Sequence, residues 1–226
     1  MDTQDNSFNK FIRALTEKWG DNSRMAGSAG VTVVTVTSEP GSGGRVVARD
    51  IADALGYHLF QRDIIQELAE SVDIDISMLD GIEKERLSDV EDWVASLANR
   101  RYLWPDLYVE QFIKIIRIIG EHGKSVIAGR GANFILPPEE RLSIRIVAPQ
   151  ELRIQNISRL LKIPEDEARK RMTAQEAKRR AFVRNCFDAD ITAPLNYDLV
   201  FNTEYVRYES VTKAVQSVLE GSRSSG

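Results

Sequence analysis

Short strand-like runs alternate with helical patterns along most of this chain, and this alternation constrains the fold more than any other feature. The runs rich in β-branched and apolar residues are Val31–Thr37, Tyr57–Phe60, Ser125–Ala128, Ser143–Val147 and Leu199–Asn202. Apolar residues recur at helical spacing in segments 45–55, 62–71, 84–100, 107–122, 149–161, 164–184 and 208–220. Strands separated by helices form βαβ units, whose parallel sheet is covered on both faces. We therefore predict an α/β fold with about five parallel strands and a long helical insertion after the second.

The two ends of the chain differ from this central part. Residues 8–19 place apolar side chains at helical spacing, and residues 20–30, GDNSRMAGSAG, have the composition of a flexible linker. The last six residues, GSRSSG, are predicted to be a disordered tail. The expected organisation is an N-terminal helix and linker over 1–30, one domain over 31–220 and a tail over 221–226.

Composition excludes several classes of protein. The net charge of −4 argues against a nucleic-acid-binding surface, and no apolar run reaches the roughly 18 residues of a membrane span. The polar N-terminus is unlike a secretory signal. One Cys and two His offer neither a disulfide framework nor a Cys/His zinc site. We predict a cytoplasmic protein without a side-chain metal site.

A glycine-rich turn joins the first strand to the first helix, in the stretch TVTSEPGSGGRVVAR over residues 35–49. Strand, glycine-rich turn and helix are the layout of the phosphate-binding loop G-x-x-x-x-G-K-[ST]. Three positions depart from that pattern: Ser38 replaces the first glycine, Gly44 the lysine, and Arg45 the serine or threonine. The loop therefore keeps an accessible backbone but lacks the usual lysine and the hydroxyl that binds Mg²⁺.

Phosphate contacts are predicted from the residues that line this turn and open the helix, namely Gly41, Ser42, Gly43, Gly44, Arg45 and Val46. Arg45 can grip phosphate oxygens bidentately, although it cannot hold a metal ion. A cation is unfavourable at a helix N-terminus, so a bound anion explains Arg45 better than helix stability does. The alternative is an ordinary glycine-rich turn with a surface arginine.

Further motifs follow the loop in a fixed order. They are LGYHLFQRD (55–63), IAGRG (127–131), IRIVAPQELR (144–153), EAKRR (176–180) and YDLVFNT (197–203). With SEPGSGGR (38–45), these motifs resemble the cytidylate kinase-like family of nucleoside-monophosphate kinases, in particular a branch with SGGR in place of SGKS. The resemblance implies a P-loop NTPase-like sheet, a helical insertion at about 62–122 that binds the acceptor nucleotide, and a lid at about 160–190.

The resemblance also assigns roles to arginines outside the loop. Arg130, just after a strand, would hold the acceptor phosphate, with Arg62 and Asp63 as further acceptor contacts. Arg179 and Arg184 would act from the lid, and Arg179 would approach the transferring phosphate only when the lid closes. Each has a structural alternative: Arg130 could pair with a carboxylate, Asp63 could cap a helix, and the lid cations could form a solvated helix face.

The activity implied by the resemblance is transfer of the ATP γ-phosphoryl group to a nucleoside monophosphate, with Mg²⁺ as cofactor. Gln61 and Gly131 depart from the residues of many cytidylate kinases, which leaves the acceptor base open. If the chain is such a kinase, Gly44→Lys with Arg45→Ser restores the lysine and the hydroxyl of the loop pattern and is expected to raise turnover. The competing hypothesis is a regulatory protein that binds a nucleotide or another anion without turnover. Nucleotides are the expected partners, nucleic acids and membranes are not, and aromatic residues in the insertion are compatible with core packing or a homodimer.

Overall fold

The computed structural model describes residues 31–61, 106–129 and 131–223. The chain divides into two units, residues 1–25 with 63–115 and residues 26–62 with 116–226. Nearly all the described residues belong to the second unit, and the fold below is the fold of that unit.

Five parallel strands form the sheet of this unit. They are β1 (Val33–Ser38), β2 (His58–Phe60), β3 (Ser125–Ala128), β4 (Arg141–Val147) and β5 (Leu199–Asn202). The strand order is β2-β3-β1-β4-β5, and every pairing is parallel. The predicted parallel sheet is confirmed, and only β4 begins clearly earlier than the apolar pattern indicated.

Helices connect these strands as predicted, except for one additional short helix and for two helices that end about three residues later than expected. The helices are α2 (Gly44–Leu55), α6 (Asp106–His122), α7 (Ala132–Ile135), α8 (Gln150–Leu161), α9 (Glu165–Phe187) and α10 (Tyr208–Arg223), with 3-10 turns at Pro138–Glu140 and Pro194–Asn196. Helix α7 was not predicted, because four residues are too few to show helical periodicity. Helix α10 continues to Arg223, so the prediction of a tail from residue 221 was wrong for its first three residues. The helices predicted at 8–19, 62–71 and 84–100 lie outside the described residues.

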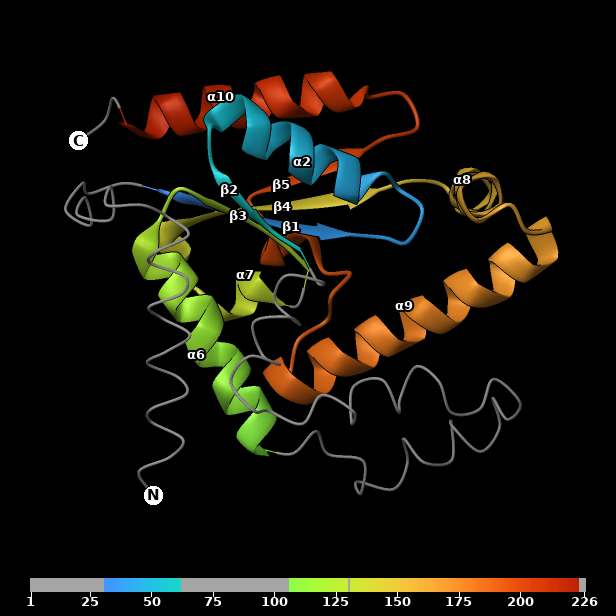
Figure 1. The fold of residues 1–226 in the computed structure, drawn as a ribbon, viewed down its shortest axis with the longest axis horizontal. Coiled ribbons are helices and arrows are strands. Elements are labelled where there is room, and N and C mark those ends of the chain that lie inside the picture. The colour runs from blue at the N-terminus through green and yellow to red at the C-terminus, as the bar shows by residue number, and fades with distance from the viewer. Residues whose placement is uncertain (1–30, 62–105, 130, 224–226) are drawn as a thin grey trace. The chain divides into compact units, whose positions relative to one another are not determined.

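The apolar core lies between the sheet and the pair α2 and α10, which run along one face (Figure 1). Alternate residues of β1 and β4, among them Val34 and Ile144, point to this face and are fully buried. Val47 of α2 and Val215 of α10 meet them, also fully buried. Because side chains alternate between the two faces of the sheet, the six residues of β1 contribute both to this apolar core and to the opposite face.

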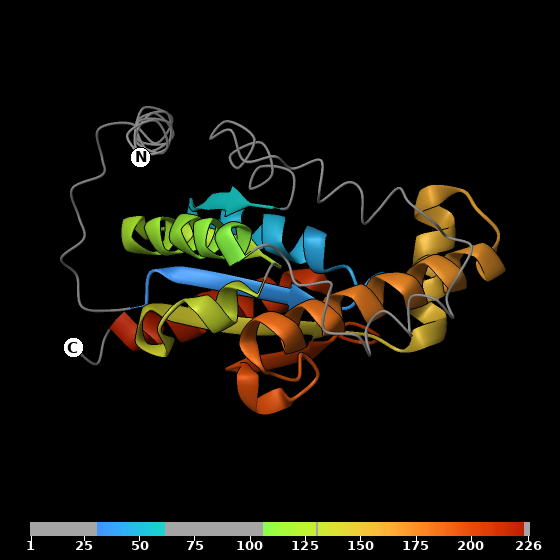
Figure 2. The ribbon, with the colours of Figure 1, turned by 90° about the horizontal axis from the view of Figure 1, so that it is seen from below.

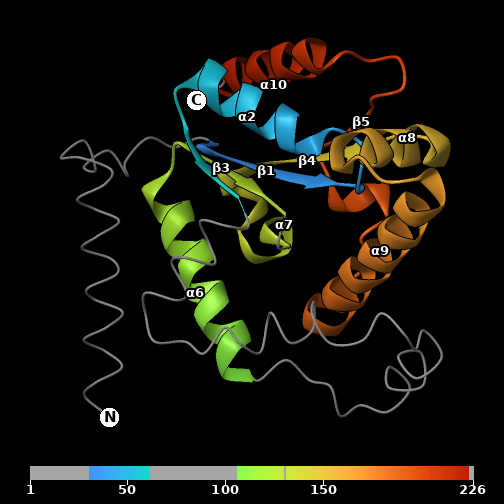
Figure 3. The same ribbon diagram turned by 45° about the vertical axis from the view of Figure 1, so that its right-hand side comes forward.

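Helix α7 lies on the opposite face of the sheet (Figure 3). The strands carry buried polar side chains there, among them Thr37 and Arg145. Thr37 of β1 donates a hydrogen bond to Asn133 of α7 at 3.3 Å. Arg145 of β4 lies over the ring of Tyr197, 5.4 Å from its centroid, and the Tyr197 hydroxyl donates to the Ile191 carbonyl at 2.7 Å. These polar groups run toward the carboxyl ends of β1 and β4, beyond which α8 and α9 lie (Figures 1 and 2).

None of the helices in the described part of the chain combines the length and the apolarity that a membrane crossing requires.

Candidate functional site

The turn between β1 and α2 is held in a fixed shape by hydrogen bonds to Ser42. Its hydroxyl donates to the carbonyl oxygens of Glu39 at 2.8 Å and Ile146 at 3.1 Å, and its amide donates to Glu39 at 3.1 Å. The Thr203 hydroxyl donates to the Ser42 carbonyl at 2.9 Å. Ser42 is completely buried, so this residue, predicted to contact phosphate, serves to shape the loop instead.

Several amides of the loop remain available. Within the described residues, the N–H groups of Gly41, Gly43, Gly44 and Arg45 donate no hydrogen bond. The amide of Val46 donates to the Gly43 carbonyl at 2.9 Å, which removes it from the predicted phosphate ligands. Unpaired amides at the start of a twelve-residue helix attract anions through their dipoles and the helix dipole. The loop therefore has the donors of a phosphate cradle.

Two glycines of the loop are required both by their backbone angles and by their neighbours. Gly41 and Gly43 have φ values of +82° and +84°. A Cβ on Gly41 would lie 2.5 Å from the Arg153 carbonyl oxygen, and one on Gly43 would lie 2.2 Å from the Tyr208 hydroxyl. Helices α8 and α10 thus pack directly against the loop backbone, which side chains at these positions would prevent.

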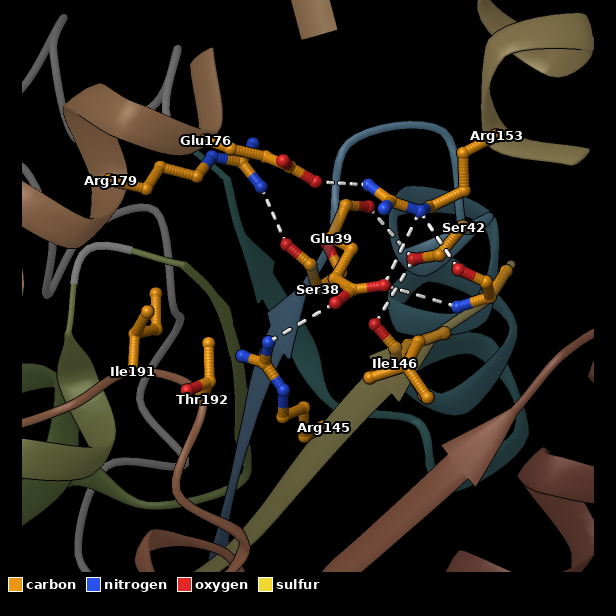
Figure 4. A network of polar contacts seen from close by, with 12 residues as sticks. Ser38, Glu39, Ser42, Arg145, Ile146, Arg153, Glu176, Arg179, Ile191 and Thr192 are labelled. Carbon is orange, nitrogen blue, oxygen red and sulfur yellow. Dashed lines mark hydrogen bonds and ion pairs between the residues drawn. The ribbon is translucent and has the colours of Figure 1, made fainter. Parts of the chain in front are cut away.

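A partly buried carboxylate, that of Glu39, lies within the loop (Figure 4). Glu39 approaches Arg145 of β4 at 3.5 Å and the Nε atom of Arg153 of α8 at 3.4 Å, and it accepts the Ala148 amide at 3.2 Å. The side chains of Arg145 and Arg153 are 6% and 9% exposed. Arg153 also pairs with Glu176 of α9. The charge of Glu39 is therefore compensated by two arginines, and the same network joins the loop to α8 and α9.

Arg179 lies at the loop itself. Its guanidinium donates to the Ser38 carbonyl at 2.6 Å, reaching it from α9 while Arg153 reaches Glu39 from α8 (Figure 4). The sequence predicted that Arg179 would approach only on lid closure. In the structure, its guanidinium contacts the last residue of β1, and its approach to a transferring phosphate stays a prediction. A cation is thus placed beside the strand end from which the cradle starts.

The other predicted arginines are placed differently. Arg45 is exposed and has no ion pair or hydrogen bond with any residue that the structure describes. Arg184 is also exposed, and no contact with the loop is found for it in the described residues. It lies near Asp190, whose pKa is lowered mainly by a hydrogen bond from the Thr192 amide and in smaller part by the charge of Arg184. Arg62, Asp63 and Arg130 lie outside the described residues.

The donor set of the loop suits phosphate but not Mg²⁺. Arg45 stands where a hydroxyl would bind the metal, and Glu39 is already engaged by two arginines. Across residues 31–61, 106–129 and 131–223, no group of three or more Asp, Glu, His or Cys side chains could hold a metal ion. The amides and Arg179, by contrast, fit the phosphates of ATP.

Sequence reasoning did not find the Glu39 network. One signal was available, because Arg145 interrupts a strand between Ile144 and Ile146 and shares none of their apolar character. Because a buried guanidinium needs a carboxylate partner, an arginine at this position indicates that a carboxylate lies nearby. Glu176 gave no comparable signal, since α9 is charged along its whole length.

Comparisons with known proteins agree with this geometry. The model of the cytidylate kinase-like family matches residues 33–205. The cytidylate kinase of Ignicoccus hospitalis is 25% identical over 190 residues, covering 84% of this chain and 99% of that protein. That of Pyrobaculum islandicum is 27% identical over 192 residues, covering 84% and 92%. The crystal structure of an uncharacterized protein from Eubacterium ventriosum has the same fold, with a TM-score of 0.63 at 17% identity over 83% of this chain and 98% of that one. Sheet order, loop and family match lead to one conclusion: this chain belongs to the cytidylate kinase-like family.

Proposed function

We propose that this protein is a nucleoside-monophosphate kinase, which transfers the γ-phosphoryl group of ATP to a monophosphate such as CMP. The observation that carries the proposal is the loop: four unpaired amides begin or precede α2, and Arg179 lies on the Ser38 carbonyl beside them. Phosphoryl transfer depends on positioning and on neutralising charge, and amides with a guanidinium supply both. Family membership supports the same reaction.

The residues have distinct roles in this proposal. Gly41, Gly43, Gly44 and Arg45 donate their backbone N–H groups to the donor phosphates, and Arg179 neutralises charge on the transferring group. Glu39, with its two arginines, fixes the loop and contacts no phosphate. Arg62, Asp63 and Arg130 bind the acceptor monophosphate, as the family resemblance implies.

Mg²⁺ would bind through the phosphates and water, because the loop offers it no oxygen ligand. When bound, a divalent cation would neutralise phosphate charge in the reaction. The residues of the chain would contribute binding, orientation and the positive charge of Arg179.

Turnover by the purified full chain with ATP and each of CMP, dCMP, UMP, AMP and GMP tests the proposal. We expect at least one monophosphate to be phosphorylated. Arg179→Ala should lower kcat by about 10- to 150-fold, the range of a charged hydrogen bond. Arg171→Ala, at an exposed arginine of the same helix that pairs with Glu167, is the matched control and should retain wild-type kcat. Equal losses in both variants would contradict the role given to Arg179.

A second candidate function is nucleotide binding without turnover, and the glycine at position 44 favours it. The lysine missing there contributes charge to the transferring phosphate in ordinary loops. ATP binding with no phosphorylated product from any monophosphate would support this candidate over the kinase.

A further inference from the structure

Two of the three departures from the phosphate-loop pattern touch one another. A Cβ built on Gly44 would lie 2.1 Å from the Ser38 Cβ and 2.4 Å from the Ser38 Oγ. Ser38 stands where the pattern has its first glycine, and Gly44 stands where it has lysine. The Ser38 side chain therefore occupies the place in which the stem of a lysine at 44 would begin.

The requirement for glycine at 44 is purely steric. Gly44 has a helical backbone and is not among the glycines of positive φ, so a side chain would be strained only by its neighbour. That neighbour cannot easily yield, because the clash involves the first atom of the Ser38 side chain. The contrast is Gly120, whose Cβ would meet only the flexible tip of Leu136, at 2.5 Å.

The charge of the missing lysine has a counterpart close to the same residue. The Arg179 guanidinium donates to the Ser38 carbonyl at 2.6 Å, so one residue excludes the lysine through its side chain and holds a cation through its backbone. The pair Glu176 and Arg153 fastens α9 to the loop one turn before Arg179. Arg45, which belongs to the loop itself, has no such attachment within the described residues.

We propose that Ser38 and Arg179 together replace the lysine of an ordinary phosphate loop, Ser38 by filling its space and Arg179 by supplying its charge. The part of this inference that concerns charge rests on the proposed function, because it needs a bound phosphate. The part that concerns space does not. The phosphate loop thus takes its cation from α9. Gly44→Lys restores an ordinary lysine-containing loop only when Ser38→Gly accompanies the change. The pair Gly44→Lys with Arg45→Ser, which the sequence alone predicts to raise turnover, leaves this clash in place.

A cycle of stability measurements on the full chain without nucleotide tests the space. Gly44→Ala should lower Tm by roughly 2–10 °C, the effect of overpacking in a chain of this size. Adding Ser38→Gly should recover most of that loss. Gly221→Ala is the matched control, since its Cβ would meet nothing within 4 Å. If Gly44→Ala costs no more than Gly221→Ala, or if Ser38→Gly does not rescue it, the inference is overturned.

A cycle of ATP-binding measurements by calorimetry tests the charge. In the natural loop, Arg179→Ala should weaken ATP binding by about 10- to 150-fold. In Ser38→Gly/Gly44→Lys, the same change should weaken it by less than about threefold, because the lysine then supplies the charge. Equal losses in both loops would overturn the exchange of charge.

The two cycles separate this inference from the proposed function. If the stability cycle shows rescue while neither loop binds ATP, the proposed function fails, the steric exchange stands and the exchange of charge is overturned. A second outcome is that ATP binds, and that Gly44→Lys equals Ser38→Gly/Gly44→Lys in both ATP affinity and Tm. In that case, the inference fails and the proposed function stands.

Discussion

Glu39 places a negative charge inside a loop whose free amides suit a negative ligand, and the loop tolerates it because of two buried arginines. Arg145 and Arg153 face the carboxylate from different elements, β4 and α8. Since a buried charge without a partner is costly, the three side chains are stable only as a set. Their geometry keeps the charge of Glu39 directed at these arginines, so the amides remain available to phosphate.

Removing that charge should cost more than removing an exposed one. Glu39→Gln is expected to lower the free energy of unfolding by about 2–4 kcal/mol, below the full cost of breaking a buried pair because Glu39 is 22% exposed. The control is Glu151→Gln, which breaks the exposed pair with Arg169 and should cost less than about 1 kcal/mol. Urea unfolding monitored by circular dichroism measures both. Equal losses would show that the Glu39 network does not stabilise the fold.

Tyr197 makes stability depend on alkaline pH. Burial raises the pKa of its phenol above that of an unfolded tyrosine, and the charge of Arg145 only partly offsets this. Because the folded pKa is the higher one, the stability that Tyr197 contributes is complete below about pH 10 and is lost as pH rises toward the folded pKa.

The free energy of unfolding should therefore differ between wild type and Tyr197→Phe by an amount that shrinks from about pH 8 to about pH 11. Urea titrations across this range give the difference. Tyr205→Phe, at a side chain that is 86% exposed, is the control and should follow wild type throughout. A difference that grows with pH would contradict the assignment.

At the scale of elements, α9 contacts the rest of its unit along its length, and three of these contacts lie from its middle to its carboxyl end. Glu176 pairs with Arg153, Arg179 donates to Ser38, and Phe187 stacks on Phe134 of α7 with ring centroids 5.4 Å apart. Phe187 also packs against Gly131, where an added Cβ would lie 2.5 Å from its ring. The carboxyl-terminal half of the predicted lid is therefore attached to the core.

Loss of the aromatic attachment should loosen α9. Phe187→Ala is expected to lower the free energy of unfolding by about 2–4 kcal/mol, somewhat less than for a fully buried phenylalanine. Hydrogen exchange should accelerate in α9 more than in α2. Leu195→Ala, at a side chain that is 97% exposed, should change stability by less than about 0.5 kcal/mol. Unchanged exchange in α9 would show that its remaining contacts suffice to hold it.

Most of the elements could be predicted because their signals are local. The β-branched run that became β1 and the apolar spacing of α2 are both read within a dozen residues. The site was only partly predictable, since its decisive contacts join distant positions. Arg145 and Glu39 lie 106 positions apart in the sequence, and Arg179 and Ser38 lie 141 apart. Spacing within one motif cannot indicate such a contact, and so Arg179 was inferred only from family resemblance.

At the scale of the whole molecule, a ligand that binds only the folded state raises its stability by mass action. At about one hundred times Kd, the gain is about 2.7 kcal/mol, which corresponds to a rise in Tm of roughly 5–10 °C for a chain of this length. Because the loop offers Mg²⁺ no ligand, ATP should stabilise the protein nearly as well in EDTA as with Mg²⁺.

Thermal unfolding with ATP, in EDTA and in excess Mg²⁺, measures this directly. We expect apparent Kd values within about threefold of one another, since the amides and Arg179 contact phosphate oxygens in either case. Adenosine, which lacks phosphates, is the control and should give little stabilisation. Stabilisation that disappears in EDTA would mean that a metal ligand exists elsewhere in the chain.

The contact between Ser38 and Gly44 also bears on how such a loop can change by mutation. A single mutation that restores lysine at 44 encounters the Ser38 side chain, and a single mutation of Ser38 to glycine removes a side chain that fills space. Either order of the two changes passes through an intermediate that is less stable than both end states. We therefore expect this loop to resist stepwise replacement by one with lysine, because each single change lowers stability on its own.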